Sequence, residues 1–125
     1  MPMKEKMKST KQKLEQKAIN LWKTACFEKY GNKCELDDET FATTPHHFYY
    51  RSSYPMLKYE VSNGVILCRH HHAKLHFKDP KSVENLIIAK RGKKWFNKLT
   101  KLSQQKIIPS YKTDAYLEDI IRKLQ

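Results

Sequence analysis

All six histidines of this sequence lie within one short segment: His46, His47, His70, His71, His72 and His76. Residues four apart on a helix share one face, so His72 and His76 could bind the same metal ion. Adjacent residues on a strand point to opposite faces, so His46 and His47 would have different neighbours. One of this pair could therefore join the metal ion while the other remains free.

A metal ion held by two or three imidazoles, with a free imidazole beside it, is an arrangement suited to hydrolysis. The ion stabilises negative charge on a phosphate oxygen, and the free histidine activates a water molecule. Histidine suits this task because its ordinary pKa lies near neutrality. The alternative interpretation is a purely structural zinc site or a chance gathering of histidines.

The elements that would position these side chains follow from local patterns. A β-prone stretch covers His47–Tyr50, a short apolar strand covers Val65–Cys68, and a helix is predicted over Arg69–Phe77. The sequence Ser62–Gly64 is a turn signal between the strands. The middle of the chain is therefore expected to run strand, loop, strand, helix.

The flanking segments are predicted to be helical. The N-terminal flank begins with a tip, residues 1–9, that has little to bury, and continues as a helix from Lys11 to the stop signal at Gly31. Three further helices are expected near the C-terminus, one between Pro80 and Gly92, one over Trp95–Leu102, and one with Thr113 as its N-cap.

Composition excludes several classes of protein. The chain has 125 residues, and no apolar run approaches the ~20 residues of a membrane span. The lysine-rich N-terminus has no apolar core of a secretory signal, and three cysteines, an odd number, favour a reducing compartment over a disulfide scaffold. The net charge of +12 is typical of proteins that meet nucleic acid.

The positive charge is concentrated in the two flanks. The predicted segments 1–33, 34–77 and 78–125 carry net charges of +6, −1 and +7. We expect one compact domain in which the middle segment holds the chemistry and the flanks grip a phosphate backbone. For the lysines of the N-terminal helix, an ordinary solvated face is an equally weighted alternative.

The segment HHFYYRSSYPMLKYEVSNGVILCRHHHAKLHF, residues 46–77, resembles the HNH endonuclease family. It combines a paired histidine on the first strand, an asparagine before an N-G-V-I-L-C strand, and a helix rich in histidine. The resemblance implies an α+β fold with a small ββα-metal, treble-clef-like core. An N-terminal helix and two to three C-terminal helices would flank that core.

The resemblance also implies roles for individual residues. His46 and His72 resemble metal ligands, His47 resembles the general base, and Asn63 resembles the residue that pins the first strand and orients the base. His76 matches a position that is a further ligand in some members and a substrate contact in others. The implied activity is hydrolysis of DNA phosphodiester bonds with one divalent ion, Mg²⁺, Mn²⁺, Ni²⁺ or Zn²⁺.

Many members of this family also hold a structural Zn²⁺ between two Cys-x-x-Cys pairs. At the matching positions only Cys34 and Cys68 remain cysteine, and the second members are Asp37 and His71. Both replacements can bind zinc, so a Cys-Asp-Cys-His site is chemically reasonable. Two alternatives stay open: Cys26 in place of Asp37, or loss of the zinc in favour of an apolar cluster.

Outside the motif, the patterns HHF-x-x-R-S-S, L-K-Y-E and W-F-x-x-L are similar to phage recombination nucleases of the NinG type. This similarity implies a phage or prophage protein that acts on DNA recombination or packaging intermediates in the bacterial cytoplasm. Arg51 and Arg69 are candidate phosphate contacts. Tyr49, Tyr50 and Tyr54 either stack on bases or pack.

Two other functions compete with the nuclease hypothesis. One is a DNA-binding module that uses the same scaffold without cleavage, and the other is a basic RNA-associated zinc protein. No groove-reading motif is evident, so DNA contacts are expected mainly at phosphates, with a steep dependence on salt. The sequence leaves the oligomeric state open, and equally whether one or both strands are cut.

Overall fold

The computed structural model describes residues 8–37, 41 and 44–125, so residues 1–7 of the predicted N-terminal tip lie outside the described part. The described chain is α+β, as predicted. Its main elements are α1 (Thr10–Tyr30), β1 (Pro45–His47), β2 (Gly64–Ile66), α2 (Arg69–Ala73), α3 (Pro80–Arg91), α4 (Lys93–Ser103) and α5 (Asp114–Leu124). Four short turns complete it, the 3₁₀ turns η1 (Pro55–Leu57), η2 (Val61–Asn63) and η4 (Pro109–Lys112) and the π-helical turn η3 (Lys74–Lys78).

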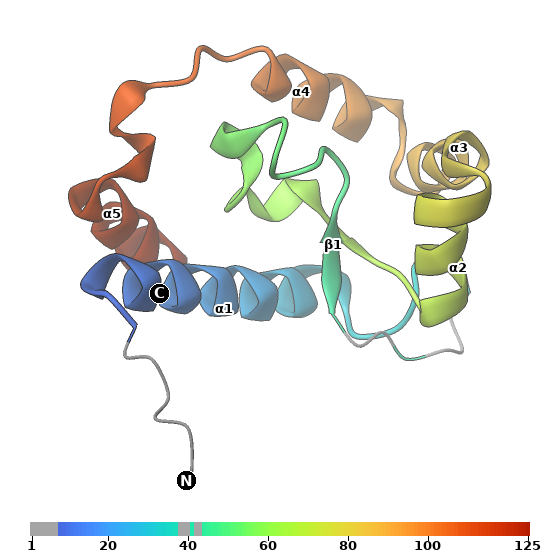
Figure 1. Ribbon diagram of the computed structural model, residues 1–125. Helices are drawn as coiled ribbons and strands as arrows, with labels where there is room; N and C mark the ends of the chain where they lie inside the picture. The colour runs from blue at the N-terminus through green and yellow to red at the C-terminus, as the bar shows by residue number, and fades with distance from the viewer. Residues whose placement is uncertain (1–7, 38–40, 42–43) are drawn as a thin grey trace, which may run out of the picture.

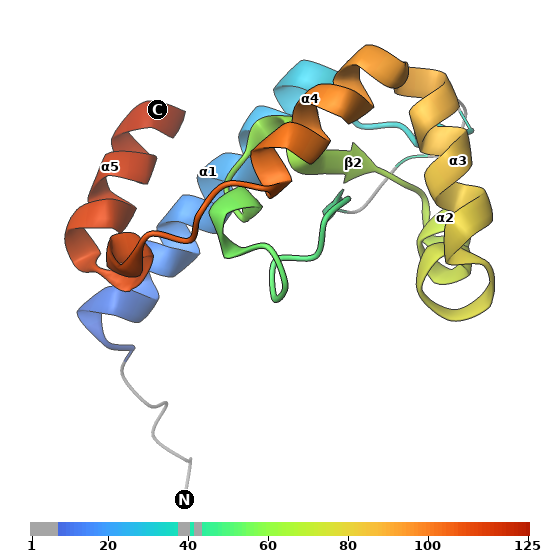
Figure 2. The same cartoon turned by 90° about the horizontal axis from the view of Figure 1, so that it is seen from above.

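Helix α1 extends along the molecule and supports the other elements (Figure 1). Helix α5 packs against α1, while α2 and α3 lie at the opposite end, beyond the two-stranded sheet (Figure 2). The sheet, α2 and η3 follow one another in the predicted order. No helix in the described ranges is long and apolar enough to cross a membrane.

Helix α1 begins at Thr10, one residue before the predicted start at Lys11, and ends at the predicted stop signal. Ser9 accepts a hydrogen bond from the backbone of Gln12, whose side chain in turn accepts one from the backbone of Ser9. This reciprocal capping box satisfies donors that the first turn would leave unpaired. Gly31 ends the helix with a φ of 84°, a conformation that favours glycine.

The first strand is shorter than the sequence indicates. Strand β1 ends at His47, so the prediction of a strand over His47–Tyr50 is wrong beyond its first residue. The two strands are antiparallel, with His46 opposite Val65 and His47 opposite Gly64. Beyond this register the side chain of Asn63 takes the backbone hydrogen bonds of Tyr49, so no further ladder forms.

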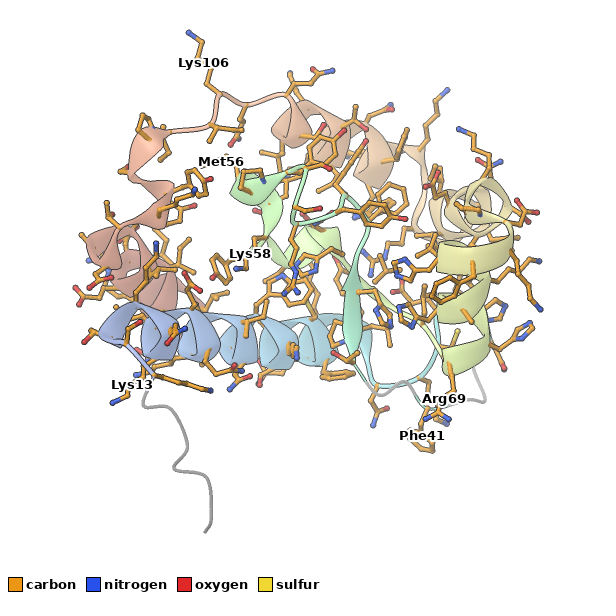
Figure 3. All side chains as sticks on the ribbon, viewed as in Figure 1. Lys13, Phe41, Met56, Lys58, Arg69 and Lys106 are labelled. Atoms are coloured by element: carbon orange, nitrogen blue, oxygen red, sulfur yellow. The ribbon has the colours of Figure 1, made fainter. Side chains whose placement is uncertain are left out.

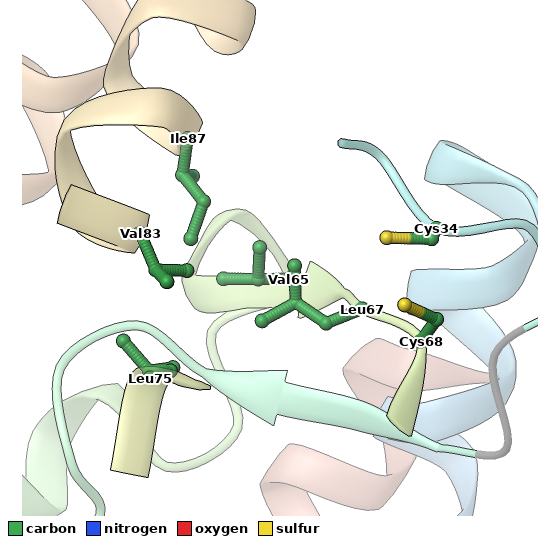
Figure 4. Packing of buried hydrophobic residues seen from close by; sticks show 7 residues of the cluster. All are labelled: Cys34, Val65, Leu67, Cys68, Leu75, Val83 and Ile87. Atoms are coloured by element: carbon green, nitrogen blue, oxygen red, sulfur yellow. The ribbon is translucent and has the colours of Figure 1, made fainter. Parts of the chain in front are cut away.

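Two clusters of buried side chains hold the elements together. One joins the loop after α1, β2, η3 and α3, through Cys34, Val65, Leu67, Cys68, Leu75, Val83 and Ile87 (Figure 4). The other joins α1 to β2 through Trp22, Cys26 and Ile66, with Leu124 of α5 packed against it. The core therefore draws on all three segments that the charge distribution separates.

Helix α1 approaches β2 very closely at Gly64. A Cβ atom at this position would lie 2.3 Å from Sγ of Cys26 and 3.1 Å from the ring of Trp22. Only glycine fits this contact without a shift of α1 or β2. The glycine of the predicted turn is thus required by packing, since its φ of −84° is open to other residues.

A buried ion pair links three parts of the chain that are distant in sequence. Arg91 at the end of α3 binds Glu35 through two nitrogens, at 2.6 and 2.7 Å, and also donates to the carbonyl oxygen of Gly64 at 2.5 Å. Glu35 accepts a further hydrogen bond from the backbone nitrogen of Ile66. These contacts tie the loop after α1 and helix α3 to β2.

Candidate active site

Strand β1 gives its two histidines different neighbours, as the alternation of a strand requires. The ring of His46 stacks on that of His72 from α2, with centroids 3.7 Å apart. The ring of His47 stacks on that of Trp22 from α1, with centroids 4.2 Å apart and planes 4° apart. His46 is thus turned toward the histidine helix and His47 toward α1.

His46, His72 and His76 form a cluster that could hold a metal ion. One ring nitrogen from each residue lies within 4.8 Å of the others. The structure therefore brings together His72 and His76, whose spacing predicted a shared ion, and His46, which the family resemblance implied as a further ligand. His72 lies on α2 and His76 on η3, so the change from α-helix to π-helical turn occurs between the two ligands.

The cluster is suited to a cation because two of its imidazoles, those of His46 and His72, favour the neutral form. Burial, followed by the neighbouring rings of His72 and His76, lowers the pKa of His46 to about 4. Burial also lowers the pKa of His72. An imidazole binds a metal ion only when it is unprotonated, so protons compete weakly for these ligands near neutral pH.

His47 is fixed in one tautomer by a backbone group. Its Nε2 lies 2.8 Å from the carbonyl oxygen of Lys58. A carbonyl oxygen can only accept, so Nε2 carries the proton and Nδ1 keeps a free lone pair in the neutral ring. Burial lowers the pKa of His47, which keeps this lone pair available. An oriented, neutral imidazole of this kind can act as a general base.

Asn63 joins the segment after β1 to the segment before β2. Its side chain is fully buried, accepts from the backbone nitrogen of Tyr49 at 2.8 Å, and donates to the carbonyl oxygens of Tyr49 at 3.0 Å and Leu57 at 3.2 Å. Its own carbonyl oxygen accepts from the backbone nitrogen of Phe48. The side chain and the backbone of Asn63 therefore hold in place the segment that follows the histidine pair.

An open cleft of about 550 Å³ lies beside the histidines of β1 and η3. His46, His47 and His76 line it, and Arg51 and Lys23 contribute positive charge. A second hollow of about 290 Å³ adjoins it, sharing Gln16, Ile19 and Arg51, and is lined also by Lys8 and Lys58. A basic groove thus leads along α1 to the histidines.

The sequence did not indicate the contribution of α1 to this cleft. Trp22 is a buried residue of α1, and its ring stacks on that of His47. Lys23 belongs to a lysine-rich helix in which no residue stands out. The contact with His47 spans 25 positions of the chain, so no local spacing could have revealed it.

A second cluster contains Cys34, Cys68 and His71, whose ligand atoms also lie within 4.8 Å of one another. The Nδ1 of His71 is 3.4 Å from Sγ of Cys34 and 3.2 Å from Sγ of Cys68, and Figure 4 shows the two sulfur atoms pointing to the same side. This Cys/His cluster could bind a metal ion. Asp37, the expected fourth ligand, is not part of the cluster.

Cys26 does not replace Asp37. Its thiol lies 3.8 Å from the carbonyl oxygen of Val61 and packs with Trp22 and Ile66, in the other core cluster. Burial raises the pKa of Cys26 to about 12, which holds the thiol neutral. Its role is therefore in packing, and the alternative ligand that the sequence left open is wrong.

The two arginines predicted to contact phosphate have different positions. Arg51 lines the cleft beside His46 and His47. Arg69 is exposed at the start of α2, labelled in Figure 3, and does not line the cleft. His70, which has no predicted role, is exposed on the same helix.

Comparisons with known proteins do not assign the chain to a family: no family model, no curated protein and no solved structure matches it. Its function must therefore be argued from the geometry of the site.

Proposed function

We propose that this protein is a metal-dependent DNA endonuclease of the HNH type, with a ββα-metal core formed by β1, β2 and the helix of α2 and η3. One observation carries the proposal: a cluster of three histidines that could hold one ion shares a cleft, through His46 and His76, with an imidazole oriented by a backbone carbonyl. A bare structural zinc site does not explain the separate orientation of His47.

The residues of the proposed site have different roles in hydrolysis. His46, His72 and His76 would hold a divalent ion, which supplies Lewis-acid stabilisation of the charge on the leaving 3′ oxygen. Nδ1 of His47 takes a proton from the attacking water, because Nε2 is occupied by the carbonyl oxygen of Lys58. Arg51 is placed to bind a phosphate next to the scissile bond.

The charge of the molecule supports DNA as the substrate. Lys8, Lys23, Arg51 and Lys58 line the adjoining hollows beside the histidines, and the whole chain carries a net charge of +12. Such a groove binds a phosphate backbone with little dependence on sequence and a strong dependence on salt. The similarity to NinG-type nucleases favours phage or prophage DNA recombination as the process served.

The test is metal-dependent nicking of a supercoiled plasmid by the full-length protein, with Mg²⁺, Mn²⁺, Ni²⁺ or Zn²⁺ supplied in turn. We expect His72→Ala to weaken metal binding and nicking together. The matched control is His70→Ala, which changes an exposed histidine on the same helix outside the cluster, and which should alter neither.

Two outcomes would refute the proposal. One is a wild-type protein that nicks no DNA with any of these ions, in which case DNA binding without cleavage becomes the better explanation. The other is a His72→Ala variant that binds metal and nicks DNA as the wild type does.

A further inference from the structure

Two exposed aromatic side chains lie beside the histidine cluster. Phe77 of η3 has 84% of its surface exposed, and Tyr50, in the loop after β1, has 42% exposed. The ring of Tyr50 is 5.8 Å from that of His76 and within 23° of parallel to it, and the ring of Phe77 is 6.1 Å from the same histidine. Both aromatic rings therefore border the proposed catalytic centre.

The fold gives no packing role to Phe77. In the same turn Leu75 points into the core and is 4% exposed, so Leu75 anchors η3. Single exposed apolar residues are common on proteins and need no explanation by themselves. Phe77 differs because it lies in a π-helical turn, a form frequent at functional sites, directly after the metal-ligand candidate His76.

The surroundings of the two rings favour a nucleic-acid strand as their occupant. Lys23 and Arg51 line the cleft in which Tyr50 and His76 also lie, and Lys78 follows Phe77. A basic channel with aromatic side chains is how proteins bind single strands, because phosphates meet the charges and bases stack on the rings. A base in a duplex has no free face for such a contact.

We propose that Phe77 and Tyr50 form a stacking platform for an unpaired nucleobase next to the scissile phosphate. The preferred DNA then has single-stranded character at the cut, as in a flap, a gap or a branch. This inference rests on the proposed function for the scissile phosphate, but the contact between base and ring can be measured without cleavage.

The experiment uses the full-length protein with EDTA present, so that no cleavage occurs. The probes are an oligonucleotide with one 2-aminopurine, as a single strand, and the same oligonucleotide paired with its complement. We expect the single strand to bind with quenching of 2-aminopurine fluorescence, because stacking on an aromatic ring quenches it. Phe77→Ala should weaken single-strand binding about tenfold or more and abolish the quenching, while duplex binding changes less than about twofold.

Three variants sharpen this result. Tyr50→Ala should weaken single-strand binding in the same selective way, and Phe77→Trp should preserve both binding and quenching. Phe41→Ala is the control, because Phe41 is also exposed, at 65%, but its ring lies against Lys33, whereas the ring of Phe77 lies beside His76. Circular dichroism verifies that each variant is folded.

The inference is overturned if Phe77→Ala binds the single strand as wild type does, or if single-strand and duplex binding weaken equally. It is also overturned if the wild type is a dimer that Phe77→Ala converts to a monomer, since the ring would then contact a second copy of the chain. A wild type that quenches the probe but cleaves no DNA would refute the proposed nuclease and leave the platform standing.

Discussion

The amide of Asn63 binds both backbone polar groups of Tyr49, accepting from its nitrogen at 2.8 Å and donating to its oxygen at 3.0 Å. This pair of bonds continues the contact between β1 and the segment before β2 at the point where the regular ladder ends. Because Tyr49 follows the histidine pair by two residues, the amide fixes the exit of the chain that carries His46 and His47.

Asn63→Asp should destabilise the protein although it keeps the shape of the side chain. The carboxylate has no N–H to donate, so it would face the carbonyl oxygens of Tyr49 and Leu57 without a hydrogen bond. Leaving such buried groups unsatisfied costs about 3 kcal/mol in the free energy of unfolding. Urea denaturation measures this loss, and an unchanged midpoint would show that the amide donor is dispensable.

The ion pair between Glu35 and Arg91 should be essential for stability. The two side chains are 9% and 6% exposed, so removal of one partner leaves the other charge buried. Arg91→Met or Glu35→Gln should each cost about 3–5 kcal/mol. The double variant should cost less than the sum of the single variants, and strict additivity in a double-mutant cycle would contradict this coupling.

Much of the secondary structure is predictable from local signals. Gly31 and Thr113 mark the end of α1 and the start of α5 where the sequence places them. The partnership of Glu35 with Arg91 spans 56 residues, and carries no periodic signal. The contact between His47 and Trp22 of α1 also joins distant positions of the chain, so it was not predicted either.

The site likewise has features that could be predicted from local sequence and features that could not. The spacing of His72 and His76 predicted a shared face, and the structure brings both to His46. Which nitrogen of His47 is free depends on the carbonyl oxygen of Lys58, 11 residues away, directly after η1. Loop conformation is set by tertiary contacts such as those of Asn63, so it could not be derived from residue types alone.

A metal titration can distinguish the cysteines that bind a metal ion from the cysteine that only packs in the core. Cys34, Cys68 and His71 form the second cluster, while Cys26 lies in the apolar core. We expect Co²⁺ added to the metal-free protein to give a thiolate charge-transfer band, which Cys68→Ser abolishes and Cys26→Ala retains. The reverse pattern, or no band in the wild type, would contradict the assignment of this cluster as a metal site.

Acid should destabilise the metal-free protein. Burial lowers the pKa of His46 from 6.5 to about 4, so the unfolded chain takes up this proton first as the pH falls. The contribution of His46 to stability is therefore complete above about pH 6.5 and is lost as the pH falls to about 4. His46→Asn should give a flatter pH dependence of the urea midpoint, and an identical slope in both proteins would contradict the shift.

The central claim is that His47 activates the attacking water, and single-turnover cleavage by His47→Ala tests it most directly. At saturating metal ion and DNA we predict a rate about 10²- to 10⁴-fold below wild type, since a general base contributes on that scale. DNA affinity and metal affinity should change little, because His47 is outside the three-histidine cluster. Cleavage by His47→Ala at the wild-type rate would contradict the account.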